Sequence, residues 1–125
     1  MGLRTIRRRL DWECLKLCGD IILMRAGFRC QCGCGRAAKD PSHVFDRDMQ
    51  NTRYDLDNLV ALSRYCHNHD RPKELNALHR KVLGEERYAE LEKRAKQIRL
   101  PWRIHELQQL KKDLLTLKEI IKNNS

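Results

Sequence analysis

The chain has 125 residues, 34% of them charged, which suits a single soluble domain with one modest hydrophobic core. Its formal net charge of +9 favours a polyanionic partner. No apolar run approaches the roughly 20 residues that a membrane-spanning helix needs. The basic N-terminal stretch also lacks the apolar segment of a secretory signal. We therefore expect a cytoplasmic protein with no membrane partner.

The first predicted element is a helix from about Arg7 to Arg25, because apolar residues recur there at helical spacing. Gly27 is expected to end it. Cys14 and Cys18 lie one turn apart within this helix. They are either small core residues or a pair of metal ligands, and the core interpretation is favoured.

A turn rich in cysteine and glycine follows the helix. Glycines let the backbone turn tightly, so closely spaced thiolates can converge on a tetrahedral zinc ion. The candidate zinc ligands are Cys30, Cys32, Cys34 and Cys66. A second cysteine pair would usually place a thiol where Ser63 stands, so His69 is an alternative fourth ligand. Disulfides and packed free thiols are the other interpretations, and a reducing compartment favours zinc over disulfides.

Two short apolar runs, His43–Phe45 and Leu59–Leu62, are predicted strands, with a polar loop between them. A lone histidine in a strand is usually structural. The position of His43 between the cysteine turn and an Asn/His pair favours a general base that takes a proton from water. Asn58, otherwise a turn residue, could brace the loop and orient the His43 ring. His67, otherwise a zinc ligand or a surface residue, could hold a catalytic divalent metal.

Helix formers dominate after His67, with a break near Asp70–Pro72. Helices are predicted over Leu75–Leu83 and from Glu85 to about Ile98, and a last helix starts at Pro101. Its apolar residues alternate steps of three and four: Leu107, Leu110, Leu114, Leu117 and Ile121. This seam either packs on the chain's own core or forms a homodimer contact. The sequence predicts one domain over residues 1–98, which includes the basic N-terminal helix, followed by an amphipathic C-terminal helix over residues 99–125.

Basic residues near these motifs in the sequence are candidates for contacts to nucleic-acid phosphates, which position a backbone without reading bases. They are Arg7, Arg8, Arg9, Arg47, Arg53 and Arg64. Most other lysines and arginines are expected on solvated helix faces. Nothing in the sequence is typical of a helix that reads a particular base sequence.

The sequence resembles the HNH, or His-Me finger, endonucleases. The resemblance lies in the order of a cysteine turn (Cys30–Cys34), a histidine (His43), an asparagine (Asn58) and a Cys-His pair (Cys66-His67). Within that group, Ser42–Arg47 followed by Asn51–Asp55 is similar to the phage NinG (Rap) recombination nucleases. Leu83–Leu91 resembles the segment after their core. The resemblance covers roughly Leu10 to Leu91.

The resemblance implies an α+β fold. A ββα-metal core with a zinc knuckle would be flanked by an N-terminal helix and C-terminal helices. It implies His43 as general base, Asn58 as its support and His67 as ligand of a catalytic Mg²⁺ or Mn²⁺, beside a structural zinc. The implied substrate is DNA, with branched recombination intermediates favoured, in a phage or its bacterial host. A homodimer through the last helix would suit two coordinated cuts.

Two positions depart from the family pattern. Ser42 stands where many HNH proteins carry an Asp or His metal ligand, which Asp46, Asp48 or water could replace. Ser63 breaks the second cysteine pair. The alternatives are therefore an HNH nicking or packaging-associated nuclease without junction preference, and a non-catalytic zinc-knuckle protein that binds DNA.

Overall fold

The computed structural model describes residues 2–69 and 72–124 and is mostly helical, with one two-stranded sheet. The predicted mixed α+β class is confirmed. In chain order the elements are α1 (Leu3–Arg25), β1 (Asp40–His43), the short 3-10 helices η1 (Gln50–Thr52) and η2 (Leu56–Asn58), β2 (Leu59–Leu62), α2 (Arg64–His69), α3 (Pro72–Leu83), α4 (Glu85–Lys96) and α5 (Ile104–Asn123). The predicted break at Asp70 and Arg71 lies outside the described residues. Among the helices of the described part, none is long and apolar enough to cross a membrane.

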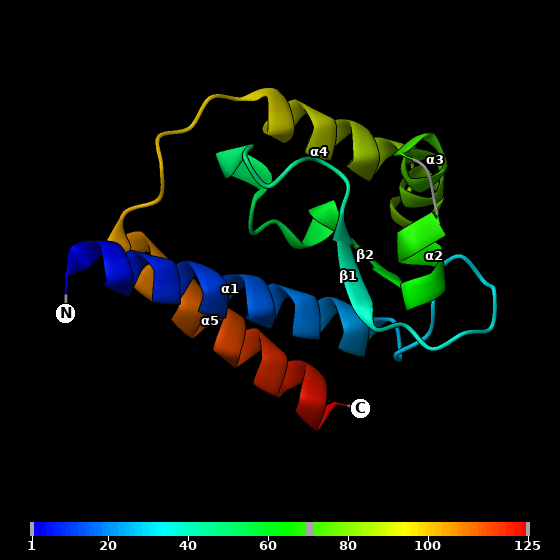
Figure 1. Ribbon diagram of the computed structural model, residues 1–125, viewed down its shortest axis with the longest axis horizontal. Coiled ribbons are helices and arrows are strands. Elements are labelled where there is room, and N and C mark those ends of the chain that lie inside the picture. Colours follow the sequence, from blue (N-terminus) through cyan, green and yellow to red (C-terminus); the bar gives the residue numbers. More distant parts are fainter. Residues whose placement is uncertain (1, 70–71, 125) are drawn as a thin grey trace.

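The two longest helices, α1 and α5, lie side by side and run in the same direction (Figure 1). Ion pairs join Glu13 to Lys111 and Asp20 to Lys118 along their length. The apolar seam predicted for α5 packs on the core that α1 supplies, with Leu107 and Leu114 buried and the other seam residues partly buried. A homodimer through α5 stays a prediction.

The sheet positions the candidate catalytic histidine. Strands β1 and β2 pair antiparallel, with His43 opposite Leu59 and Asp40 opposite Leu62. Side chains alternate along a strand, so His43 and Pro41 share the face that α1 covers. Pro41 approaches α1 so closely that a Cβ built at Gly19 would lie 2.8 Å from its Cγ. Gly19 therefore lets the helix and the strand meet.

The first strand differs from its prediction. The sequence predicts a strand over His43–Phe45, whereas β1 ends at His43 and begins at Asp40. The Asn58 side chain binds both backbone groups of Phe45, which replaces strand pairing there. The predicted strand at Leu59–Leu62 is confirmed, and every residue of β2 is buried. The helix predictions are confirmed with shifted ends, most visibly in α1, which begins at Leu3, and α5, which begins at Ile104.

Two apolar clusters fill the interior. The larger one joins α1 and α5 to the sheet face that carries Leu59 and Ala61. The smaller one lies on the opposite face, where Val60 and Leu62 pack with Cys30 and Cys66. Only a few residues make up this second cluster. Further interactions are therefore needed to hold α2 and the cysteine turn in place.

Candidate active site and metal centre

Four thiols gather beside the smaller cluster. The Sγ atoms of Cys30, Cys32, Cys34 and Cys66 all lie within 4.8 Å of one another. Neighbouring sulfurs are 3.2 Å apart for Cys30 and Cys32, and 3.8 Å apart for Cys34 and Cys66. Four thiolates at the usual Zn–S distance of about 2.3 Å lie about 3.8 Å from one another. The donor set therefore fits a structural metal ion such as zinc, and the four cysteines could hold one.

The surroundings of these sulfurs favour thiolates at Cys30 and Cys34, whereas burial and the neighbouring thiols raise the pKa of Cys32 to about 12. A backbone N–H bond from Arg36 is the largest effect lowering the pKa of Cys34, to about 6. Burial opposes ionisation of Cys30, but hydrogen bonds from the backbones and side chains of Ser63 and Cys32 together outweigh it and lower the pKa of that thiol. Gly33 and Gly35 have φ of 85° and 84°, conformations that a side chain would strain. Hydrogen bonds from backbone N–H groups to sulfur, such as those to Cys34 and Cys30, orient the ligands of thiolate metal sites.

Ser63, which breaks the second cysteine pair, has a different role. It precedes the first residue of α2, and its Oγ accepts a hydrogen bond from the backbone N–H of Cys66 at 3.1 Å. A serine that bonds in this way caps the start of a helix. Ser63 therefore fixes the turn that presents Cys66 to the other thiols. The Nδ1–H of His69 donates to the Tyr65 carbonyl at 2.7 Å.

The cysteine turn is docked on the second strand. The backbone N–H of Gln31 donates to the Ala61 carbonyl at 2.9 Å, and the Gln31 side chain accepts from the Ala61 N–H at 2.8 Å. The four-thiol cluster is thus tied to β2 as well as to α2. Cys14 and Cys18 lie elsewhere, fully buried in the larger core, where burial raises their pKa to about 11 and about 12.

The ring of His43 is partly buried at the end of β1. Its Nε2 lies 3.2 Å from the backbone carbonyl of Arg53. A carbonyl only accepts hydrogen bonds, so Nε2 carries the proton and Nδ1 keeps its lone pair. Burial lowers the pKa of His43, and the charges of Arg47 and Arg53 lower it further. The imidazole is therefore neutral at neutral pH, the state that a general base requires.

Asn58 is completely buried and holds the loop after β1. Its Oδ1 accepts from the Phe45 N–H at 2.8 Å, and its Nδ2 donates to the carbonyls of Phe45 and Thr52. These bonds join the start of the loop to η1. The contact to the His43 ring comes from the Arg53 carbonyl, one residue beyond Thr52, so the described hydrogen bonds connect Asn58 to the ring only by way of the loop.

Replacing Asn58 with alanine is expected to reduce the free energy of unfolding by roughly 2–4 kcal/mol, since three hydrogen bonds are lost at about 1 kcal/mol each. Urea denaturation followed by circular dichroism would measure the change. Asn76→Ala is the matched control, because Asn76 is exposed on α3. An Asn58→Ala protein as stable as Asn76→Ala would contradict this role.

His67 lies on α2, next to a carboxylate that sequence reasoning overlooked. Its Nδ1 is 3.7 Å from Oδ2 of Asp40, whose Oδ1 is 3.3 Å from Arg64. Asp40 and Ser42 share one face of β1, the face opposite His43. With Nδ1 turned toward a carboxylate, Nε2 is the ring nitrogen left for another ligand.

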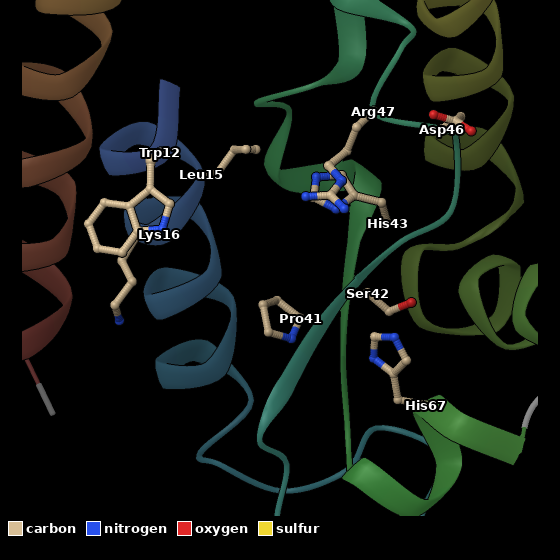
Figure 2. A pocket seen from close by; sticks show the side chains of 9 residues that line it. All are labelled: Trp12, Leu15, Lys16, Pro41, Ser42, His43, Asp46, Arg47 and His67. Carbon is tan, nitrogen blue, oxygen red and sulfur yellow. The ribbon is translucent and has the colours of Figure 1, made fainter. Parts of the chain in front are cut away.

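The two histidines line one open pocket of about 530 Å³ at the edge strand β1 (Figure 2). Ser42 and His43 come from β1, His67 comes from α2, and the opposite wall is α1. The remaining lining residues are Trp12, Leu15, Lys16, Pro41, Asp46 and Arg47. The structure therefore brings together two of the predicted site residues that are 24 positions apart.

The predicted phosphate-binding arginines are spread over several surfaces. Arg7 and Arg8 line a second pocket beside Trp102, and Arg9 is exposed on α1. Arg47 lines the pocket of the two histidines. The remaining two make ion pairs with carboxylates, Arg53 with Asp11 and Arg64 with Asp40.

Comparisons with known proteins do not assign this chain to a family. A scan against protein-family models, a search of curated proteins and a search of solved structures each gave no match. The HNH resemblance therefore rests on the motif residues themselves.

Proposed function

We propose that the chain is a metal-dependent HNH endonuclease that hydrolyses DNA phosphodiester bonds. One observation carries the proposal: His43 and His67 line the same open pocket, beside a four-thiol cluster that could hold zinc. The order of two antiparallel strands and a short helix, β1, β2 and α2, is the order that a ββα-metal core would have.

The second metal of this proposal would be held by His67. The imidazole Nε2 and nearby oxygens, from Asp40, Ser42 and water, are donors that Mg²⁺ or Mn²⁺ accepts. A divalent ion bound there would supply positive charge to the scissile phosphate and to the leaving oxygen. Asp46 lines the same pocket and is a further oxygen donor.

His43 would perform the proton transfer. Its Nδ1 accepts a proton from a water molecule while the water oxygen forms a bond to phosphorus. The bond between phosphorus and the leaving sugar oxygen breaks on the opposite side, and that oxygen takes a proton from solvent. The reaction consumes one water and yields a phosphate end and a hydroxyl end.

The surroundings of the pocket suit a nucleic acid. Lys16 and Arg47 line it and can contact phosphates. Trp12, on the opposite wall, leaves 64% of its surface exposed, which is unusual for so large an apolar side chain. Its indole offers a face on which a base could stack. The net charge of +9 adds a long-range attraction for DNA.

Cleavage assays with chelator-treated protein test this proposal. Adding Mg²⁺ or Mn²⁺ is expected to restore cutting of DNA. A four-way junction should be cut faster than a linear duplex of the same sequence, if branched intermediates are the substrate. Equal rates would favour a nicking or packaging-associated nuclease. Binding of both DNAs with no cleavage would favour the non-catalytic zinc-knuckle protein and contradict the enzyme proposal.

Cleavage is expected to depend on pH through His43. The neutral ring is the active form, so the rate should rise with pH and reach half of its plateau below the ordinary histidine pKa of about 6.5. Burial, the largest cause of the lowered pKa, sets this direction. Single-turnover rates between pH 5 and 8 would measure the profile, and an NMR titration of the His43 ring should give the same midpoint. A midpoint well above 6.5 would contradict the assignment.

A further inference from the structure

An ion-pair network links α1 to the carbonyl that binds the His43 ring. The guanidinium of Arg53 forms two parallel bonds to Asp11, from Nε to Oδ1 and from Nη2 to Oδ2, each 2.8 Å long. Its Nη1 donates to the Arg47 carbonyl at 2.9 Å. The hydroxyl of Tyr54 donates to the same carboxylate. Asp11 therefore binds two successive residues of the loop, although it lies more than 40 positions away in the sequence.

This network is partly shielded from water. The side chains of Arg53 and Asp11 are 19% and 28% exposed, and their contact is bidentate. Paired geometry of this kind fixes the orientation of both groups, beyond what a single charge contact would do. The paired Arg53 side chain therefore fixes the position of the Arg53 backbone. The carbonyl of that backbone accepts the hydrogen bond from His43 Nε2.

We propose that Asp11 is a positioning residue for the candidate base: by holding Arg53 it fixes the carbonyl that keeps the proton of His43 on Nε2 and the lone pair on Nδ1. This inference deepens the proposed function and rests on it in one respect, namely that His43 acts as a general base. The tautomer itself is a property of the folded protein and can be measured without any reaction. Asp11 makes no contact with the ring among the described interactions and acts through Arg53.

The test compares Asp11→Asn with Asp20→Asn. Both aspartates lie on α1, are about equally exposed and bind two partners, but Asp20 binds Lys16 and Lys118, which are helix residues outside the loop. Long-range ¹H–¹⁵N NMR spectra report which ring nitrogen of His43 carries the proton. The wild type and Asp20→Asn are expected to show the Nε2–H form, whereas Asp11→Asn should show a mixture of tautomers.

Cleavage gives the second readout. Asp11→Asn is expected to lower kcat roughly 10- to 100-fold with little change in KM, since misplaced catalytic groups cost about that much. Arg53→Lys keeps the charge but loses the bidentate contact, and it should reproduce both effects if Asp11→Asn does not fold. An unchanged tautomer in both variants would overturn the inference. If the wild type cuts no DNA, the proposed function fails, while the NMR comparison still decides the positioning role.

Discussion

Replacing His43 with alanine is expected to lower the rate of metal-dependent DNA cleavage by roughly 10²- to 10⁴-fold, the usual contribution of a general base. The ring is neutral, its Nε2 is bound to the Arg53 carbonyl, and Nδ1 is the nitrogen that can take a proton from water. DNA binding should change little, because the substitution removes no positive charge at neutral pH. Single-turnover cleavage and a separate binding titration would distinguish the two steps.

His105→Ala is the matched control for that experiment. His105 is exposed on α5 and lines surface hollows away from the pocket of His43. The control should cut DNA at the wild-type rate. If His43→Ala also kept that rate, His43 would not be the base and the catalytic site would have to lie elsewhere.

Replacing Cys66 with serine is expected to release bound zinc and to lower the melting temperature on the order of 10 °C or more. Cys66 is the thiol from α2, whereas the other three come from one turn. The smaller apolar cluster around Val60 and Leu62 buries too few side chains to hold that turn on α2 by itself. Zinc content by mass spectrometry and thermal unfolding by circular dichroism would measure the two effects.

Cys18→Ala separates loss of metal from loss of packing. Cys18 is fully buried in the larger core, and its Sγ lies 3.5 Å from the Tyr54 carbonyl. This variant should also be destabilised but should keep the zinc content of the wild type. A Cys66→Ser protein that retained its zinc and its melting temperature would contradict a structural role for the four-thiol cluster.

The helices were predictable because their apolar periodicity is a local property of the sequence. The seam of α5 is a clear example, since the same residues that repeat at steps of three and four pack on α1. The four thiols could also be predicted as a metal site, because closely spaced thiols in a glycine-rich turn can converge on one ion. The fourth ligand was ambiguous from the sequence, because Ser63 stands where a second cysteine pair would place a thiol. Only the structure shows that Ser63 caps the start of α2.

Other features depend on contacts between distant residues. The end of β1 was misplaced because Val44 and Phe45 have strand-forming side chains, while the bonds that Asn58 makes to the Phe45 backbone come from 13 residues further on. The Asp11–Arg53 pair joins a helix to a loop 42 positions away, and neither residue is unusual in its own segment. Asp40 could have been noticed by strand alternation with Ser42, but only if β1 had been placed correctly.

A crystal structure of the protein with Mn²⁺, measured at the absorption edges of zinc and manganese, tests the central claim most directly. The claim is that a structural zinc and a catalytic metal occupy separate sites, the zinc in the four-thiol cluster and the catalytic metal in the pocket of His43 and His67. We expect a zinc signal among Cys30, Cys32, Cys34 and Cys66, and a manganese signal in the pocket at Nε2 of His67, with Nδ1 of His43 bound to no metal. A manganese signal away from this pocket, or one metal bound by both His43 and His67, would contradict it.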